Sequence, residues 1–185
     1  IKHLEPLYVD LVRDLGARKG EREWNIGLGS AHLNDHVELT TLLEYEFAPI
    51  NRLGFEIEIP FTFSFGSGNT QEPIPGNRLD GLKLATQYTF LVSPRFNTSA
   101  AIGYLNEFEL TSFNKYGKEQ IVRANIMHPF LVVAKSWKNN IHTMLITGPE
   151  WEKEMRSRGT ELYFHANGSI HYAVPATKSV IGVEI

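Results

Sequence analysis

Pairs of glutamates two positions apart are the first feature of this sequence that could do chemistry. The pairs are Glu44 with Glu46, Glu56 with Glu58, and Glu107 with Glu109. Residues two apart on a strand share a face, and neighbouring strands bring such pairs together. Paired carboxylates can bind a cation or exchange protons with a substrate. We favour a polar network in which Lys83, Arg123 and Lys135 neutralise the acids, over cation or solute selection and over catalysis.

A second polar set alternates along one segment. It consists of His165, Asn167, Ser169 and His171. On a strand, the Cα atoms of Ser169 and His171 would lie roughly 6–7 Å apart, which a nucleophile and its base can tolerate. The chain has no Gly-x-Ser-x-Gly elbow, and outer-membrane lipases resemble a His-x-Ser order rather than this Ser-x-His order. We interpret the set as a polar ladder, with a lipid-modifying enzyme as the alternative.

Metal, cofactor and nucleic-acid sites are not predicted. The sequence has no cysteine, and no His-x-x-x-His pattern links His128, His142, His165 and His171, so these four would have to meet across strands to hold a metal. A formal net charge of -3 gives no electrostatic case for binding nucleic acid. We therefore expect no metal, no cofactor and no nucleic-acid partner.

The segments that carry these groups alternate apolar and polar residues. Between Gly54 and Phe65, for example, the apolar residues from Phe55 onward occupy every second position. The segments 36–48 and 160–175 behave in the same way. They exceed the usual five or six residues of strands in globular proteins and match the roughly 9–11 residues that cross a bilayer as a strand. This length is the main argument for a membrane sheet.

The whole chain after residue 21 divides into nine such segments. They lie near residues 22–30, 36–48, 53–66, 79–92, 96–110, 120–136, 139–149, 160–175 and 178–185. Short connections alternate with long polar ones at 67–78, 111–119 and 149–159, as in barrels of the outer membrane. Such barrels have even strand counts, so we expect about eight to ten strands, with a further strand missing or miscounted.

Composition is compatible with this fold. The 185 residues suffice for one domain, and no apolar run approaches the roughly 18 residues of a membrane-spanning helix. The apolar faces are continuous and rich in aromatic residues, whereas the polar faces mix charges with small residues such as Gly27, Ala85, Ala101 and Gly103, which suit a narrow lumen. We predict an all-β, antiparallel up-and-down transmembrane β-barrel of the bacterial outer membrane. A soluble, lipocalin-like ligand-binding barrel is the alternative.

The first 21 residues have a different period. Their apolar residues recur at helical spacing, between Pro6 near the start and Gly16 at the stop; they are Leu4, Leu7, Tyr8, Leu11, Val12 and Leu15. We predict an amphipathic helix and linker over residues 1–21 and a barrel over 22–185. The helix would cap one end of the barrel, or dock on a membrane surface or a partner. No signal peptide is visible, so an exported chain would be in its mature form.

The opening residues also resemble a known family. The run from Glu5 to Glu21, EPLYVDLVRDLGARKGE, followed by Glu23-Trp24-Asn25 and later by Glu44–Pro49, is similar to an uncharacterised family of bacterial barrels. The resemblance covers the whole chain. It implies a barrel of the cell envelope and brings no activity, substrate or catalytic residue.

Together these observations favour a non-enzymatic envelope protein. It would be a narrow solute channel or a structural or partner-binding barrel, because the interior of a barrel of about eight strands is just filled by side chains. Its expected partners are outer-membrane lipid and other envelope proteins.

Overall fold

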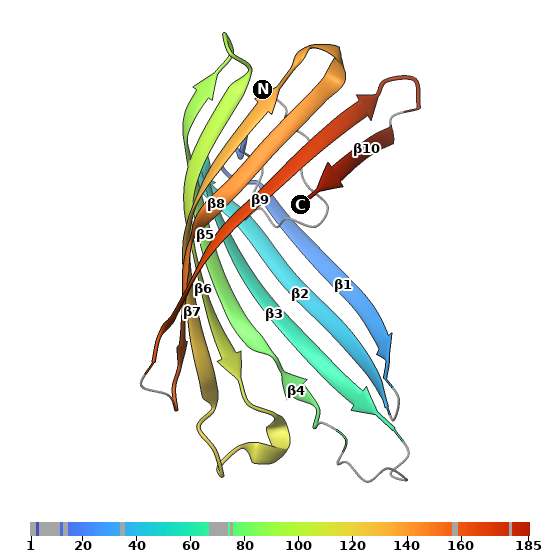
Figure 1. Cartoon of the computed structure of the whole chain (residues 1–185), viewed down its shortest axis with the longest axis vertical. Coiled ribbons are helices and arrows are strands. Elements are labelled where there is room, and N and C mark those ends of the chain that lie inside the picture. Colours follow the sequence, from blue (N-terminus) through green and yellow to red (C-terminus); the bar gives the residue numbers. More distant parts are fainter. Residues whose placement is uncertain are drawn as a thin grey trace.

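The computed structural model describes residues 3, 12, 15–33, 36–66, 74, 76–156, 159–177 and 179–185. Within them the chain forms one twisted antiparallel sheet in which each long strand pairs with the next (Figure 1). The strands are β1 (Arg22–His32), β2 (Val37–Ile50), β3 (Leu53–Phe65), β4 (Arg78–Leu79), β5 (Gly81–Ser93), β6 (Thr98–Leu110), β7 (Val122–Ser136), β8 (Ile141–Glu154), β9 (Glu161–Val174) and β10 (Ser179–Glu184). Two short 3-10 turns, Phe113–Lys115 and Lys138–Asn140, lie between strands.

The predicted all-β, antiparallel up-and-down fold is confirmed. Each of the nine predicted segments corresponds to one strand, eight of them long and the last the six-residue β10, and the two-residue β4, which pairs only with β3, is additional. The prediction that residues 149–159 connect two strands is wrong for 149–154. There β8 continues to Glu154, and Trp151 and Glu152 still pair with β9.

Short turns gather at one end of the sheet and longer connections at the other (Figure 1). The turns after β2, β5 and β7 each contain one residue in the left-handed region, namely Arg52, Asn97 and Asn140. Asparagine adopts this backbone more readily than other residues with a side chain, which suits the last two turns. Turns this tight hold consecutive strands in one register.

The two faces of the sheet have opposite character, because side chains alternate along each strand. The outer face carries large apolar side chains that remain exposed, such as Ile102, Leu145 and Ile170 at 53 %, 45 % and 61 %. The inner face is buried and carries polar and charged side chains. These include Glu44, Glu46, Glu56, Thr62, Lys83, Gln87, Thr89, Ser99, Ser169 and His171.

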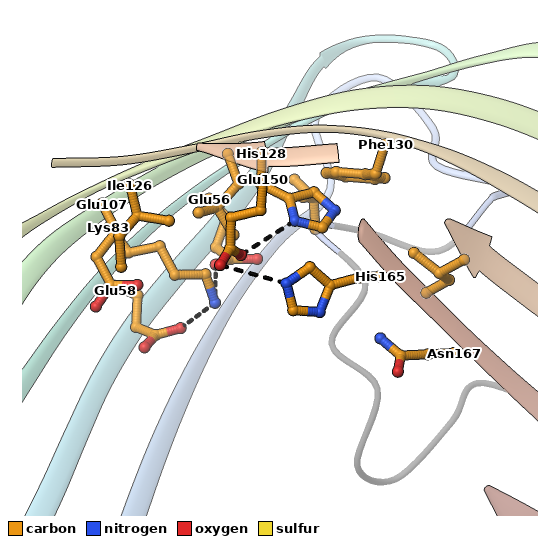
Figure 2. Close-up of a pocket in the computed structure, with 13 residues that line it drawn as sticks. Glu56, Glu58, Lys83, Glu107, Ile126, His128, Phe130, Glu150, His165 and Asn167 are labelled. Carbon is orange, nitrogen blue, oxygen red and sulfur yellow. Dashed lines mark hydrogen bonds and ion pairs between the residues drawn. The ribbon is translucent and has the colours of Figure 1, made fainter. Parts of the chain in front are cut away.

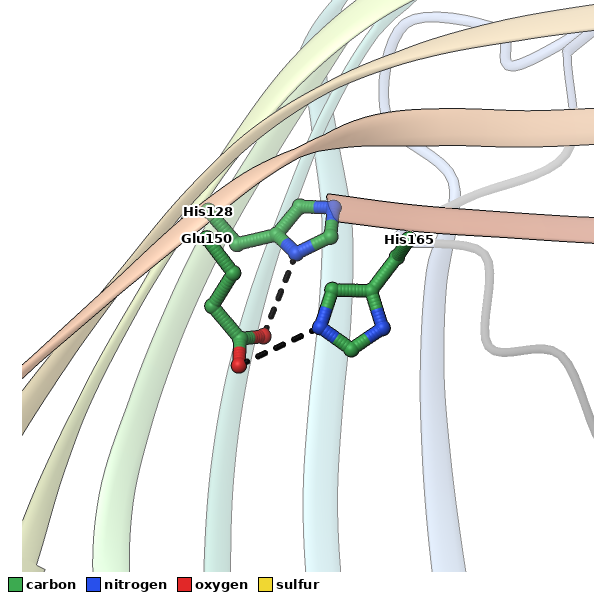
Figure 3. Close-up of side chains that lie close together, drawn as sticks. All are labelled: His128, Glu150 and His165. Atoms are coloured by element: carbon green, nitrogen blue, oxygen red, sulfur yellow. Dashed lines mark hydrogen bonds and ion pairs between the residues drawn. The ribbon is translucent and has the colours of Figure 1, made fainter. Parts of the chain in front are cut away.

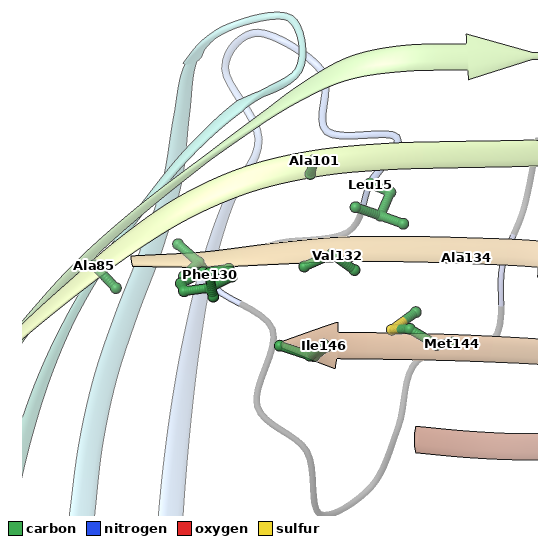
Figure 4. Packing of buried hydrophobic residues seen from close by; sticks show 9 residues of the cluster. Leu15, Ala85, Ala101, Phe130, Val132, Ala134, Met144 and Ile146 are labelled. Carbon is green, nitrogen blue, oxygen red and sulfur yellow. The ribbon is translucent and has the colours of Figure 1, made fainter. Parts of the chain in front are cut away.

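Within the described residues, buried apolar side chains form one cluster on the inner face (Figure 4). There Val12 and Leu15, from the segment that precedes the sheet, are buried with Val132 on β7 and Met144 on β8. The rest of the predicted N-terminal helix lies outside the described residues. Backbone hydrogen bonds then tie the linker to the turn after β2, because the Ala17 carbonyl accepts from the Arg52 N–H at 2.7 Å.

The sheet does not close among the described strands, since β1 and β10 each pair on one side only. The short β10 covers only the second half of β9. No helix within the described residues is long and apolar enough to span a membrane.

Candidate functional site

The predicted acidic pairs on β2 and β3 face each other across the sheet. The register places Glu44 opposite Glu58 and Glu46 opposite Glu56. Directly opposed like charges destabilise a sheet unless something neutralises them. The side-chain amide of Asn25 on β1 donates to Glu44 Oε1 at 2.7 Å and to Glu46 Oε1 at 3.1 Å.

Lys83 on β5 neutralises the other half of this group. Its Nζ lies 2.6 Å from Glu58 Oε2 and 3.2 Å from Glu56 Oε1. The Lys83 and Glu56 side chains are only 11 % and 1 % exposed, so these charges are largely removed from water. Glu107 on β6 is the register partner of Lys83 on the opposite side. Lys83 therefore sits among carboxylates from both neighbouring strands, as the predicted network requires.

Two histidines and a glutamate form a second cluster beside the first (Figure 3). His128 Nδ1 on β7 lies 3.2 Å from Glu150 Oε2 on β8, and His165 Nε2 on β9 lies 3.3 Å from Glu150 Oε1. The two imidazole rings are 5.3 Å apart between centroids. Three adjacent strands thus each contribute one side chain to the same point.

Glu56, Glu58 and Lys83 of the first cluster line one cavity of about 400 Å³ with the whole second cluster (Figure 2). Asn167 also reaches this cavity from β9, and Val12 and Phe130 form part of its apolar wall. The described lining residues include four acids and one lysine. The acids are Glu56, Glu58, Glu107 and Glu150, and the lysine is Lys83. The cavity therefore has the character of a site for a cation or a small polar molecule.

The hydrogen-bonded ladder between β7 and β8 is interrupted at the histidine cluster. Pairing stops after Met127 opposite Trp151 and resumes at Leu131 opposite Thr147, without a shift in register. Continuing that register would place Pro129 opposite Pro149. Because proline has no N–H to donate to a ladder, two opposed prolines account for the break. His128 and Glu150 lie opposite each other within this break, each next to one of the prolines.

The Ser169 and His171 pair lies on the inner face of β9, as the alternation predicts. Both residues are buried, and His171 Nε2 lies 3.0 Å from Glu184 Oε1 on β10. Ser169 Oγ has no hydrogen-bond partner among the described residues. A nucleophile and its base need a separation of about 2.6–3.2 Å, so the hydrogen bond on which the enzyme alternative depends is missing.

Three other predicted residues lie apart from the cavity. Glu109 stays on β6 opposite Gly81, near the end of the strand. Arg123 is exposed and lines a different pocket with Glu119 and Glu154, next to a register shift between β6 and β7. Lys135 does not join the predicted network, because its Nζ stacks over the Trp137 ring at 4.4 Å.

Sequence reasoning missed Glu150 and did not expect His128 to meet His165. Glu150 follows Gly148-Pro149, which resembles the end of a strand, so it was assigned to a connection. The position of His128 on the polar face of its segment is the one sequence feature that indicates an inward-facing side chain. The separation of 37 positions between His128 and His165 becomes a contact only through the register of three strands.

Comparisons with known proteins give one match. A family model described as HAEPLYID-like matches residues 1–185. No curated protein and no solved structure matches the chain.

Proposed function

Starting from a chain that belongs to the HAEPLYID-like family, we propose that this protein is a non-enzymatic β-barrel of the bacterial outer membrane. In this proposal the sheet closes in the bilayer, with its apolar face in lipid and its polar face inward. The interior holds a small charged ligand rather than an open pore.

The inverted polarity of the sheet carries the proposal. Ile102, Leu145 and Ile170 are exposed on the outer face, while Glu56 and Lys83 are buried on the inner face. A water-soluble sheet protein has the reverse arrangement, with its apolar side chains inward. Lipid on the outer face would remove the exposed apolar surface from water, as in barrels of the outer membrane.

Stacked aromatic rings on the outer face add support. Trp24, Tyr45, Phe47 and Phe55 follow one another across β1, β2 and β3, with centroid separations of 4.4, 5.7 and 5.4 Å. They lie near the end of the sheet that carries the short turns. Membrane barrels carry girdles of aromatic residues near the ends of their strands, where the aromatic side chains lie at the headgroup level of the bilayer.

The soluble alternative fits the inner face less well. A lipocalin-like barrel would enclose an apolar ligand cavity, whereas the cavity here is lined by Glu56, Glu58, Lys83 and Glu150. Burying these charges beside an apolar ligand would be costly.

The packing of the N-terminal segment favours a binding barrel over an open channel. Val12 and Leu15 are 3 % and 2 % exposed and pack against Val132 and Met144 on the inner face. Apolar side chains packed against the inner face in this way obstruct a water-filled path through the interior of the barrel. The cavity beyond them remains large enough for a small polar ligand.

Heat-modifiability tests the proposal. The membrane fraction is solubilised in detergent, and gel mobility in dodecyl sulfate is compared with and without boiling. A closed barrel has no free edge and resists unfolding until boiled, so the unboiled sample should migrate differently. A chain that stays in solution without detergent and shows no mobility shift would contradict the membrane barrel.

A further inference from the structure

The cluster of His128, Glu150 and His165 has the composition of a transition-metal site. Two imidazoles and one carboxylate are the ligands of many catalytic zinc sites, and imidazole prefers zinc and its neighbours to calcium or magnesium. One ligand atom of each residue can be chosen so that all three lie within 4.8 Å of one another. We propose that these three residues bind one divalent transition ion of the zinc class.

The distances agree with this ligand set. Bonds of about 2.0–2.1 Å in a tetrahedral zinc site place neighbouring ligand atoms about 3.3 Å apart. The Glu150 oxygens lie 3.2 Å from His128 Nδ1 and 3.3 Å from His165 Nε2. Each histidine therefore lies at the required separation from one of the two Glu150 oxygens, and with a single oxygen as the ligand the three ligand atoms lie within 4.8 Å of one another.

The strands hold these side chains in place. Gly148 is the register partner of His165, so no side chain of β8 stands between His165 and Glu150. His128 and Glu150 lie within the break at the opposed prolines, where β7 and β8 approach closely. Ligands on rigid strands need little reordering to bind an ion.

The surroundings favour a cation and leave it accessible. The cluster lines the cavity shared with Glu56, Glu58 and Glu107, whose charge raises the local concentration of cations. The His165 side chain is 40 % exposed, whereas that of His128 is 13 % exposed. An ion held here would keep its remaining coordination position toward the cavity, open to water or to a small ligand.

The simpler interpretation is a hydrogen-bonded pair of histidines sharing one carboxylate. It predicts no saturable binding of metal. The two interpretations are separated by titrating the full-length chain, folded in detergent and stripped with a chelator, with Zn²⁺ in a calorimeter. We expect one Zn²⁺ per chain, and Co²⁺ should give the visible absorption of a tetrahedral site. Absence of saturable Zn²⁺ binding by the wild-type chain overturns the proposal.

Matched variants identify the ligands. His128→Gln, Glu150→Gln and His165→Gln should each weaken Zn²⁺ binding by at least about 100-fold, because a direct ligand contributes no less than an outer-shell partner, whose loss costs up to that much. His171→Gln is the control, because His171 is a buried histidine of the same strand that contacts Glu184 and lies outside this cavity. Equal weakening by His171→Gln and His165→Gln would overturn the assignment.

The metal proposal stands apart from the membrane proposal. A chain that binds Zn²⁺ but stays soluble without detergent contradicts the membrane barrel alone. A heat-modifiable chain that binds no Zn²⁺ contradicts the metal site alone.

Discussion

At the scale of single residues, charge balance on the inner face depends on Lys83. Its Nζ is within 3.2 Å of carboxylates on both Glu56 and Glu58, and all three side chains are largely buried. Removing one partner of a buried ion pair costs far more than the pair contributes, because the other charge stays buried without compensation. Asn25 cannot replace the lysine, since it donates to Glu44 and Glu46 instead.

We expect Lys83→Met to lower the free energy of unfolding by about 3 kcal/mol. The measurement is urea unfolding in detergent, followed by tryptophan fluorescence. Adding Glu58→Gln to this variant should recover part of the loss, because one uncompensated charge is then removed.

The control for this variant is Lys118→Met, in the exposed connection between β6 and β7. It should change stability by less than about 0.5 kcal/mol. If Lys83→Met changes the free energy of unfolding no more than the control does, the ion pairs of Lys83 with Glu56 and Glu58 do not stabilise the protein.

At the scale of elements, the β7–β8 pair is built around its proline break. Pro129 and Pro149 interrupt the ladder without changing its register, so the strands remain aligned on either side. Gly148 lies at this break, and a methyl group there would collide with the carbonyl oxygen of Pro129. The close approach of the two backbones therefore requires glycine for its small size.

We expect Gly148→Ala to destabilise the protein by about 2 kcal/mol, because the collision is with the backbone and β7 would have to shift. Gly168→Ala on β9 is the matched control. Its added methyl group would meet its nearest atoms at 3.9 and 4.0 Å, which is ordinary contact. This control should be neutral or stabilising by up to about 1 kcal/mol. Similar losses for both variants, in the same urea titration, would argue against a specific contact at Gly148.

At the scale of the whole molecule, the stability of the protein depends on whether the outer face of the sheet contacts water or lipid. Ile102 lies within β6, between Tyr88 on β5 and Leu131 on β7, and is 53 % exposed. Ile121 is 51 % exposed but precedes β7 in a connection at the end of the sheet. The two isoleucines are thus equally exposed at different levels of the molecule.

If the outer face lies in lipid, Ile102→Arg should destabilise the protein by about 2–4 kcal/mol, since arginine is costly near the bilayer midplane. Ile121→Arg should cost no more than about 1 kcal/mol, as expected near the interface. Urea titrations of the protein folded into lipid vesicles measure both values. Equal and small effects of the two variants would mean that the outer face of the sheet is solvated.

The sequence alone determined most of the fold. Alternation with period two located every long strand, because side chains of a strand necessarily point to opposite faces. It also grouped the residues by face, so that Glu56 and Glu58 were expected together with Lys83. The two-residue β4 was not predicted as a separate strand, and the largest error in strand bounds is at the end of β8, since neither has a periodic pattern that differs from a connection.

The tertiary structure decided which residues of a common face actually meet. His128, Glu150 and His165 belong to three strands, and only the offsets of β7, β8 and β9 bring them to one point. Those offsets are a property of strand pairing across the sheet and cannot be read from the alternation along any one strand. A periodic pattern specifies the face on which each side chain lies. It does not specify which side chains of neighbouring strands lie next to one another on that face, and the candidate metal site depends on this alignment.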